Sequence, residues 1–140
     1  MPVTEFAVLE ALPPYAVDSA PIQSFLADVG RQQASWSGYP LMFFRDTVSP
    51  THVYLVSGWK DVPAHNVWIA SEPNQELLRR AASILAVREF FHLGIDFETM
   101  PVGVQRMTWE VSLRGHAGAE SDAETVTGGR WNMVWEGAGP

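Results

Sequence analysis

The sequence contains no cysteine among its 140 residues. Disulfide bonds, cysteine nucleophiles and thiolate metal sites are therefore excluded. It also has no HExxH pattern or close His/Asp triad for a metal, no glycine-rich phosphate loop and no GxSxG nucleophile turn. We therefore expect no metal and no cofactor. Any enzyme built from the remaining residues would use acid–base groups and a shaped apolar cavity.

Basic residues are scarce: nine Lys and Arg stand against sixteen Asp and Glu, which gives a formal net charge of −7. Because no basic cluster is present, binding to a nucleic acid backbone is not expected. No apolar run approaches the roughly 18 residues of a membrane span, and the N-terminus lacks a secretory pattern. We therefore expect a cytoplasmic protein whose partner is a small molecule, with no nucleic acid and no membrane.

Apolar residues are plentiful, at 46% of the chain, whereas charged residues make up 18%. This balance suffices for a folded core. The six Trp, seven Phe and three Tyr can both fill that core and line an apolar ligand pocket. The length fits one domain, residues 1–140, with a core over residues 3–100 and a C-terminal extension over residues 101–140.

Hydrophobic periodicity and turn residues predict the order βαββαβ for the core. The expected strands are Val3–Leu12, Leu41–Thr47, Thr51–Trp59 and Ile95–Met100. The expected helices run from Asp18 to about Ser35, from Val62 to Ala70, and from Pro73 to about His92. Two further strands, Val102–Leu113 and Arg130–Glu136, flank a loop in the extension. The sequence thus predicts an α+β, ferredoxin-like fold with extra C-terminal strands.

Both faces of the expected sheet are apolar. In the second strand Leu41 and Phe43 alternate with Met42 and Phe44. A sheet that carries helices on one side only normally alternates apolar and polar residues, so its second face must be buried. A second copy of the sheet would bury it, which predicts a homodimeric α/β barrel. The alternative cover is the C-terminal extension of the same chain.

His65 and His92 are the candidate catalytic residues. His65 shares one face of its helix with Trp68 and should point inward. His92 lies near the expected end of the long helix, where the helix dipole should raise its pKa. Two inward histidines converging on one cavity would act as general base and acid. The alternative is that each is a satisfied core or capping residue. His52 is undecided, and His116 is expected in the solvated loop.

Other side chains are candidates for substrate binding. Arg45 and Tyr54 would contact a carboxylate or enolate oxygen, or instead form a rim salt bridge and an ordinary core contact. Trp36, Trp59 and Trp68 would pack in the core and also form a pocket wall. Four acids lie within expected strands: Glu5, Glu10, Asp96 and Glu98. One that points inward would orient a His or act as a base, and at least three should face solvent.

The stretch Val56–Ser71, VSGWKDVPAHNVWIAS, resembles the third strand and following helix of the antibiotic-biosynthesis monooxygenase and stress-responsive families of dimeric α+β barrels. A Gly-Trp at the strand end, followed by Ala-His and an aromatic residue in the helix, carries the resemblance. Phe90–His92 fits the fungal-type members. The resemblance covers about residues 3–100. It implies a homodimeric barrel with a pocket between sheet and helices in each subunit.

Members of that superfamily include cofactor-free monooxygenases, polyketide cyclases, decarboxylases and haem-degrading enzymes. The haem-ligating His corresponds to Leu78 here, which argues against haem. The catalytic His of plant polyketide cyclases corresponds to a position near Pro73-Asn74. His65 and His92 would therefore substitute for it, or Asn74 would contribute a hydrogen bond.

The resemblance leads us to expect a cofactor-independent tailoring enzyme of secondary metabolism. It would catalyse the cyclisation, dehydration or rearrangement of a polyketide-like or aromatic small molecule. Two alternatives stay open. One is a cofactor-free monooxygenase that oxidises a phenolic, anthrone-like substrate with O2. The other is a non-enzymatic stress-response or ligand-binding protein.

Overall fold

The computed structural model describes residues 1–104, 106–111 and 129–135, and the side chains of residues 1–104. The elements in chain order are β1 (Val3–Ala11), α1 (Ala20–Ser37), β2 (Leu41–Asp46), β3 (His52–Trp59), α2 (Val62–Ala70), α3 (Glu72–Ala81), β4 (Leu85–Leu93), the 3-10 helix η1 (Phe97–Thr99), β5 (Arg106–Val111) and β6 (Gly129–Trp135). The fold is α+β, and its first four strands and three helices are compatible with a ferredoxin-like arrangement.

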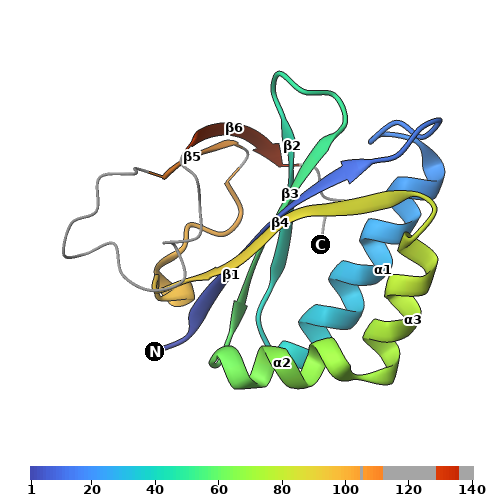
Figure 1. Cartoon of the computed structure of the whole chain (residues 1–140). Helices are drawn as coiled ribbons and strands as arrows, with labels where there is room; N and C mark the ends of the chain where they lie inside the picture. Colours follow the sequence, from blue (N-terminus) through green and yellow to red (C-terminus); the bar gives the residue numbers. More distant parts are fainter. Residues whose placement is uncertain (105, 112–128, 136–140) are drawn as a thin grey trace.

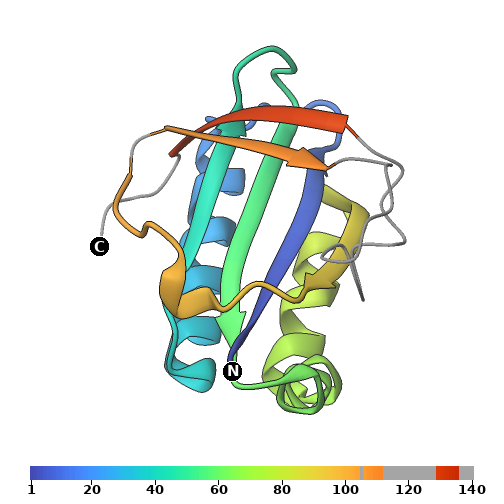
Figure 2. The same cartoon turned by 90° about the vertical axis from the view of Figure 1, so that its left-hand side faces the viewer.

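The sheet has the strand order β4-β1-β3-β2-β6-β5, and its neighbouring strands are antiparallel. Helices α1, α2 and α3 cover one face of β1–β4 (Figure 1). Strands β5 and β6 and the short helix η1 lie on the other side, where the two strands cross β1–β3 (Figure 2). The central strand β1 therefore presents alternate side chains to two different environments.

The predicted long helix from Pro73 to His92 is wrong in its second half. Helix α3 ends at Ala81, and Leu85–Leu93 forms β4 beside β1. Apolar residues in this stretch fit the helical period, but Val87, Phe90 and Phe91 also favour a strand. Pairing with β1 supplies the backbone hydrogen bonds that decide the outcome. His92 therefore lies on a strand, and the expected effect of a helix end on its pKa does not apply.

The predicted strand Ile95–Met100 is also wrong. Its place in the order is taken by β4, and the segment forms the 3-10 helix η1 instead. The Asp96 side chain caps this turn by accepting a hydrogen bond from the backbone N–H of Glu98 at 3.0 Å. Phe97 then packs against the sheet face opposite the helices. A short polar side chain thus competes with strand pairing here.

Helix α2, predicted over Val62–Ala70, is confirmed. Asp61 caps its start by accepting a hydrogen bond from the backbone N–H of Ala64 at 2.8 Å. Ser71 ends α2 and starts α3, where its hydroxyl accepts a hydrogen bond from the backbone N–H of Asn74 at 3.3 Å. The Asp61 cap fixes the first turn of α2, which holds His65 against the sheet.

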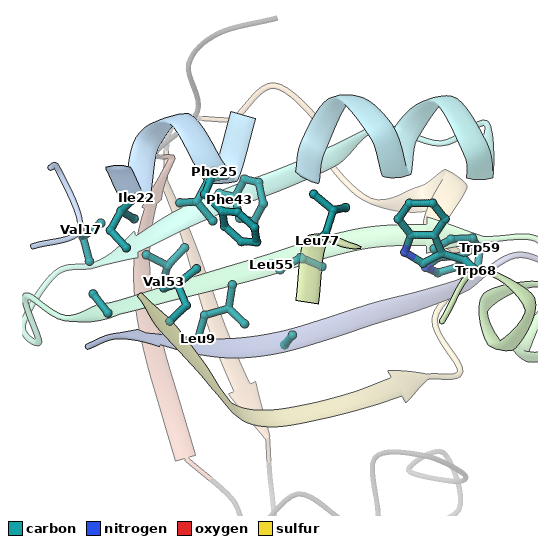
Figure 3. Packing of buried hydrophobic residues seen from close by; sticks show 14 residues of the cluster. Leu9, Val17, Ile22, Phe25, Phe43, Val53, Leu55, Trp59, Trp68 and Leu77 are labelled. Atoms are coloured by element: carbon teal, nitrogen blue, oxygen red, sulfur yellow. The ribbon is translucent and has the colours of Figure 1, made fainter. Parts of the chain in front are cut away.

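Two hydrophobic clusters lie on opposite faces of the sheet. The cluster beneath the helices includes Phe25, Phe43 and Leu55, with Trp59 and Trp68 at one end (Figure 3). The opposite cluster includes Phe6, which is fully buried, and Phe97 from η1. Both faces are therefore apolar, as the alternation predicted. Because the second face is already buried within one chain, its pattern alone does not require a second copy.

Candidate functional site

A row of polar residues crosses the helix-covered face of the sheet. Glu5 of β1 lies opposite Ser57 of β3 on one side and opposite His92 of β4 on the other. Two more polar side chains approach this row from the helices, Gln33 from α1 and His65 from α2. All five side chains are buried, with at most 8% of their surface exposed. Five buried polar groups together must satisfy one another or a ligand.

One oxygen of Glu5 is the centre of this cluster. Its Oε1 accepts hydrogen bonds from Ser57 Oγ at 2.8 Å, Trp59 Nε1 at 2.8 Å and Gln33 Nε2 at 3.0 Å. Gln33 Nε2 also donates to Ser57 Oγ at 2.9 Å, which ties α1 to the sheet. Three donors on one oxygen form a cradle for a carboxylate and hold it in a single orientation.

The two candidate histidines meet behind Glu5. His65 Nδ1 lies 2.6 Å from His92 Nε2, and His65 Nε2 lies 3.6 Å from Glu5 Oε1. The imidazole of His65 also stacks on the indole of Trp59, with ring centroids 4.4 Å apart. Both histidines turn inward and meet, as predicted, although His92 arrives on a strand and only His65 borders the cavity described below.

The proton positions follow from the hydrogen bonds. The 3.6 Å contact between His65 Nε2 and Glu5 Oε1 is longer than a hydrogen bond, and a proton on Nε2 would point toward that oxygen. A neutral His65 then accepts at Nδ1 from the N–H of His92 Nε2. His92, His65 and Glu5 thus form a chain of neighbouring titratable groups. Such a chain can hold and balance a buried carboxylate.

Burial favours the neutral forms of Glu5 and His65. It raises the pKa of the Glu5 carboxyl, whereas hydrogen bonds from Trp59, Ser57 and Gln33, and a positive charge on His92, act against the rise. Burial and the neighbouring His92 lower the pKa of His65 to about 3. His65 is therefore neutral at neutral pH. Its 3.6 Å contact with Glu5 is a neutral donor facing a carboxyl group and not an ion pair.

Glu5 and His65 border a cavity of about 370 Å³ between the sheet and the helices. This volume falls in the range of about 300–1,000 Å³ that small-molecule sites occupy. Its wall is otherwise apolar, apart from Gln33 and Asn74. The exposed side chains of Leu78, Val87 and Phe90 also border it: Leu78 is on α3, the other two on β4. The cavity therefore opens between α3 and β4.

Only some of the predicted substrate-binding residues border this cavity. Trp68 and Asn74 do, whereas Trp59 lies behind His65 as a hydrogen-bond donor to Glu5. Trp36 is half-exposed and packs on Trp68, with ring centroids 5.3 Å apart. The predicted pocket wall is thus correct for one Trp. The other two support it from outside.

Arg45 and Tyr54 do not border the cavity, so the structure gives their predicted substrate contacts no support. Arg45 is exposed near the end of β2. Tyr54 belongs to the opposite face, where its hydroxyl donates a short hydrogen bond to Asp46. Strand alternation gives the reason, since Tyr54 is one residue from the inward-facing Leu55. His92 also lies outside the cavity wall, behind His65.

Gln33 and Ser57 were not predicted as site residues, and Glu5 was predicted only as one of four strand acids that could point inward. Each interrupts an inward apolar row. Gln33 continues the helical stripe of Phe25, Leu26 and Val29, and the other two occupy alternate positions of strands β1 and β3. A polar residue in register with core positions was the available signal. Of the other acids, Glu10 pairs with Arg88, and His116 lies outside the described residues.

Within residues 1–104 and the other described positions, no group of three or more His, Asp or Glu is arranged to hold a metal ion. In the same part of the chain, no helix is long and apolar enough to cross a membrane. No protein-family model matches the sequence, and no curated protein matches it.

Proposed function

We propose that the chain is a cofactor-independent acid–base enzyme that cyclises, dehydrates or rearranges an uncharged, polyketide-like or aromatic small molecule. The observation that carries the proposal is the buried chain Glu5–His65–His92, whose first two members border an otherwise apolar cavity. Connected titratable groups beside an apolar cavity are typical of proton-transfer sites. A cavity that only stored an apolar ligand would not need a buried carboxyl group.

The cavity wall indicates the class of substrate. Aromatic and aliphatic side chains dominate it, so it suits a flat or folded apolar body. The residues that line it are all described, and neither Lys nor Arg is among them. A carboxylate or phosphate on the substrate would therefore have no cation to pair with. An uncharged molecule with ketone, enol or phenol groups at the Glu5 end fits best.

Cyclisation of such a molecule needs no oxidant. A base removes a proton from carbon next to a carbonyl group, and the resulting enolate carbon attacks a second carbonyl group of the same chain. One C–C bond forms, and the new alkoxide takes a proton back. Loss of water then gives an aromatic ring. The protein would supply the base, return the proton and hold the folded chain away from solvent.

Heptane-2,4,6-trione is a suitable probe, because its aldol cyclisation with loss of one water gives 5-methylresorcinol. We expect the wild-type protein to accelerate this product over the competing pyranone, as followed by proton NMR. His65→Ala and His92→Ala should each reduce the rate. Glu10→Gln, an exposed acid on the same strand, should leave it unchanged. Unchanged turnover in both histidine variants would contradict the acid–base proposal.

The same preparation separates the alternative functions. Oxygen uptake with 1,8-dihydroxyanthrone, lost in His65→Ala, would identify a cofactor-free monooxygenase. Binding of both compounds without any turnover would identify a ligand-binding protein. The homodimeric barrel remains a prediction, which light scattering on the purified chain tests. A monomer mass would contradict it and would agree with the burial of the second sheet face inside one chain.

A further inference from the structure

Both ring nitrogens of His65 face protein side chains. Nδ1 is held by His92 at 2.6 Å, and Nε2 faces Glu5 Oε1 at 3.6 Å. The ring itself is sandwiched, with Trp59 stacked on it and Phe90 tilted against it at a centroid distance of 5.3 Å. His92 does not border the cavity. The imidazoles therefore face the carboxyl group and each other, although the reaction needs a group that reaches the ligand.

The second oxygen of Glu5 is that group. The donors Ser57, Trp59 and Gln33 all bind Oε1. No buried side-chain N or O of the described residues lacks a hydrogen-bond partner, so Oε2, to which none of these residues donates, is accessible. Because Glu5 borders the cavity, this accessible oxygen faces it. Oε1 already accepts three hydrogen bonds, so a proton on the carboxyl group would reside on Oε2.

We propose that Glu5 Oε2 is the atom that exchanges a proton with the ligand, and that His65 and His92 are positioning residues behind it. The ligand group at this oxygen would be an uncharged C–H or O–H acid, such as a β-diketone, an enol or a phenol. The inference rests on the proposed acid–base function and assigns its catalytic residue. A carboxylate ligand would meet Glu5 with like charge and no cation beside it.

The groups that face Glu5 define how its activity should depend on pH. They come from every element packed around it: Gln33 on α1, Ser57 and Trp59 on β3, His65 on α2 and His92 on β4. Only the two histidines among them can carry a positive charge. A charge on His92 stabilises the carboxylate and lowers the pKa of Glu5. Removing His92 should therefore move the acid limb of a base-catalysed reaction to higher pH.

A simple probe tests the base directly. In 5-nitrobenzisoxazole a base takes the proton from carbon 3, the electron pair of that C–H bond forms the nitrile, and the N–O bond breaks to release a coloured phenolate. Atoms and electrons balance without any co-reactant. The probe is uncharged and aromatic, as the cavity requires. Its rate reports a base in an apolar site, independently of the natural substrate.

The experiment compares the wild-type chain with five variants, and one of them, His65→Gln, tests the imidazole as the base. Glu5→Gln keeps an acceptor for the three donors but loses the base, and we expect a loss of about 100-fold or more in kcat. Glu5→Asp withdraws the carboxylate by one methylene, so kcat should fall with little change in KM. His92→Gln should stay active with its acid limb moved to higher pH. Glu10→Gln, the matched control on β1, should behave as wild type.

The outcomes separate the inference from the proposed function. If Glu5→Gln retains the wild-type rate while His65→Gln abolishes it, His65 is the base. The assignment to Glu5 then fails, whereas the acid–base function stands. If the wild-type chain does not accelerate the probe at all, both fail. Should Glu5→Gln not fold, the Glu5→Asp variant decides: an unchanged kcat at full folding would overturn the inference.

Discussion

The two faces of strands β1–β4 are made from alternate residues of the same segments, yet they differ in what they enclose. On the face opposite the helices, Phe6 stacks between Tyr54 and Phe91, with ring centroids 5.8 and 5.2 Å away. On the helix-covered face, the same strand contributes Glu5 and Ala7 to the wall of a cavity. The size of the side chains on the central strand thus decides which face fills and which stays open.

The buried polar groups on the two faces also differ. On the packed face, the hydroxyl of Tyr54 donates to Asp46, and burial together with this carboxylate raises the pKa of Tyr54. That pair is closed and is best explained as structural. On the cavity face, one oxygen of Glu5 has no donor among the residues that the structure describes, and the residue borders the cavity. The difference separates a polar contact that holds the fold from one that serves the cavity.

The largest expected difference between the faces is in stability. Phe6→Ala should reduce the free energy of unfolding by about 4–5 kcal/mol, because a fully buried ring leaves a void. Phe25→Ala, on the cavity face, should cost nearer about 3 kcal/mol, because that ring already borders empty space. Urea unfolding measures both. Equal losses would contradict the distinction between a packed and an open face.

Two glycines extend the comparison. A Cβ at Gly58 would lie 2.5 Å from Cγ and 2.9 Å from Cβ of Phe97, so Gly58→Ala should cost about 1–3 kcal/mol. A Cβ at Gly30 of α1 would meet Phe43 at an ordinary 3.7 Å. Gly30→Ala should therefore stabilise the protein by about 0.5–1 kcal/mol. If thermal unfolding shows Gly58→Ala to be more stable than Gly30→Ala, the packed face accommodates the added methyl group by small shifts.

The raised pKa of Glu5 predicts a pH-dependent difference between wild type and Glu5→Gln. Between the ordinary value of 4.5 and the raised value, the folded state keeps a proton that the unfolded chain has released. Raising the pH through this window therefore favours unfolding of the wild type, by at most about 1.4 kcal/mol per pH unit. Glu5→Gln has no carboxyl group at this position, so its stability does not change with pH in this window for that reason.

His65 has the opposite effect, because its lowered pKa makes stability fall as pH drops below about 6.5. That contribution is common to both proteins and largely cancels in their difference. Urea unfolding from about pH 4 to about pH 8 gives this difference directly. A constant difference over the range would show that the pKa of Glu5 is ordinary.

The smallest effect is expected from filling the cavity. Ala7→Val adds two carbon atoms at a wall position, so stability should change by less than about 1 kcal/mol. Binding of 2-naphthol should weaken, because the added carbons take ligand space. Val8→Ile on the packed face is the matched control, with a larger loss of stability and unchanged binding. Calorimetry that finds unaltered binding in Ala7→Val would place the ligand elsewhere.

Much of the core was predictable from local pattern. Neighbouring residues suffice to predict the strand alternation through Leu41–Phe44. They also suffice to predict the helix Val62–Ala70 with its Asp61 cap. The stretch from Leu85 to Leu93 was not predictable, because its apolar spacing fits both a helix and a strand. Only pairing with β1, some eighty residues earlier in the chain, decides between them.

The site was half predictable. An inward His65 followed from the pattern of its helix, whereas His92 was predicted inward from a helical pattern and lies instead on β4. Their 2.6 Å contact did not follow from the pattern, because it depends on the register that sets His92 beside Glu5. The sequence offered Glu5 as one of four strand acids but could not single it out, since an acid in a strand faces solvent more often than the core. Register across three strands, which one sequence does not reveal, brings the carboxyl group and its donors together.

The central claim is that the carboxyl group of Glu5 faces the cavity and titrates there. Carbon-13 NMR of the glutamate side-chain carboxyls, with Glu5 assigned by its absence in Glu5→Gln, tests this most directly. We predict a Glu5 resonance that titrates above its ordinary value of 4.5 and shifts when 2-naphthol is added, whereas the Glu10 resonance does not respond to 2-naphthol. A Glu5 resonance that titrates at its ordinary value and ignores the ligand would contradict the account.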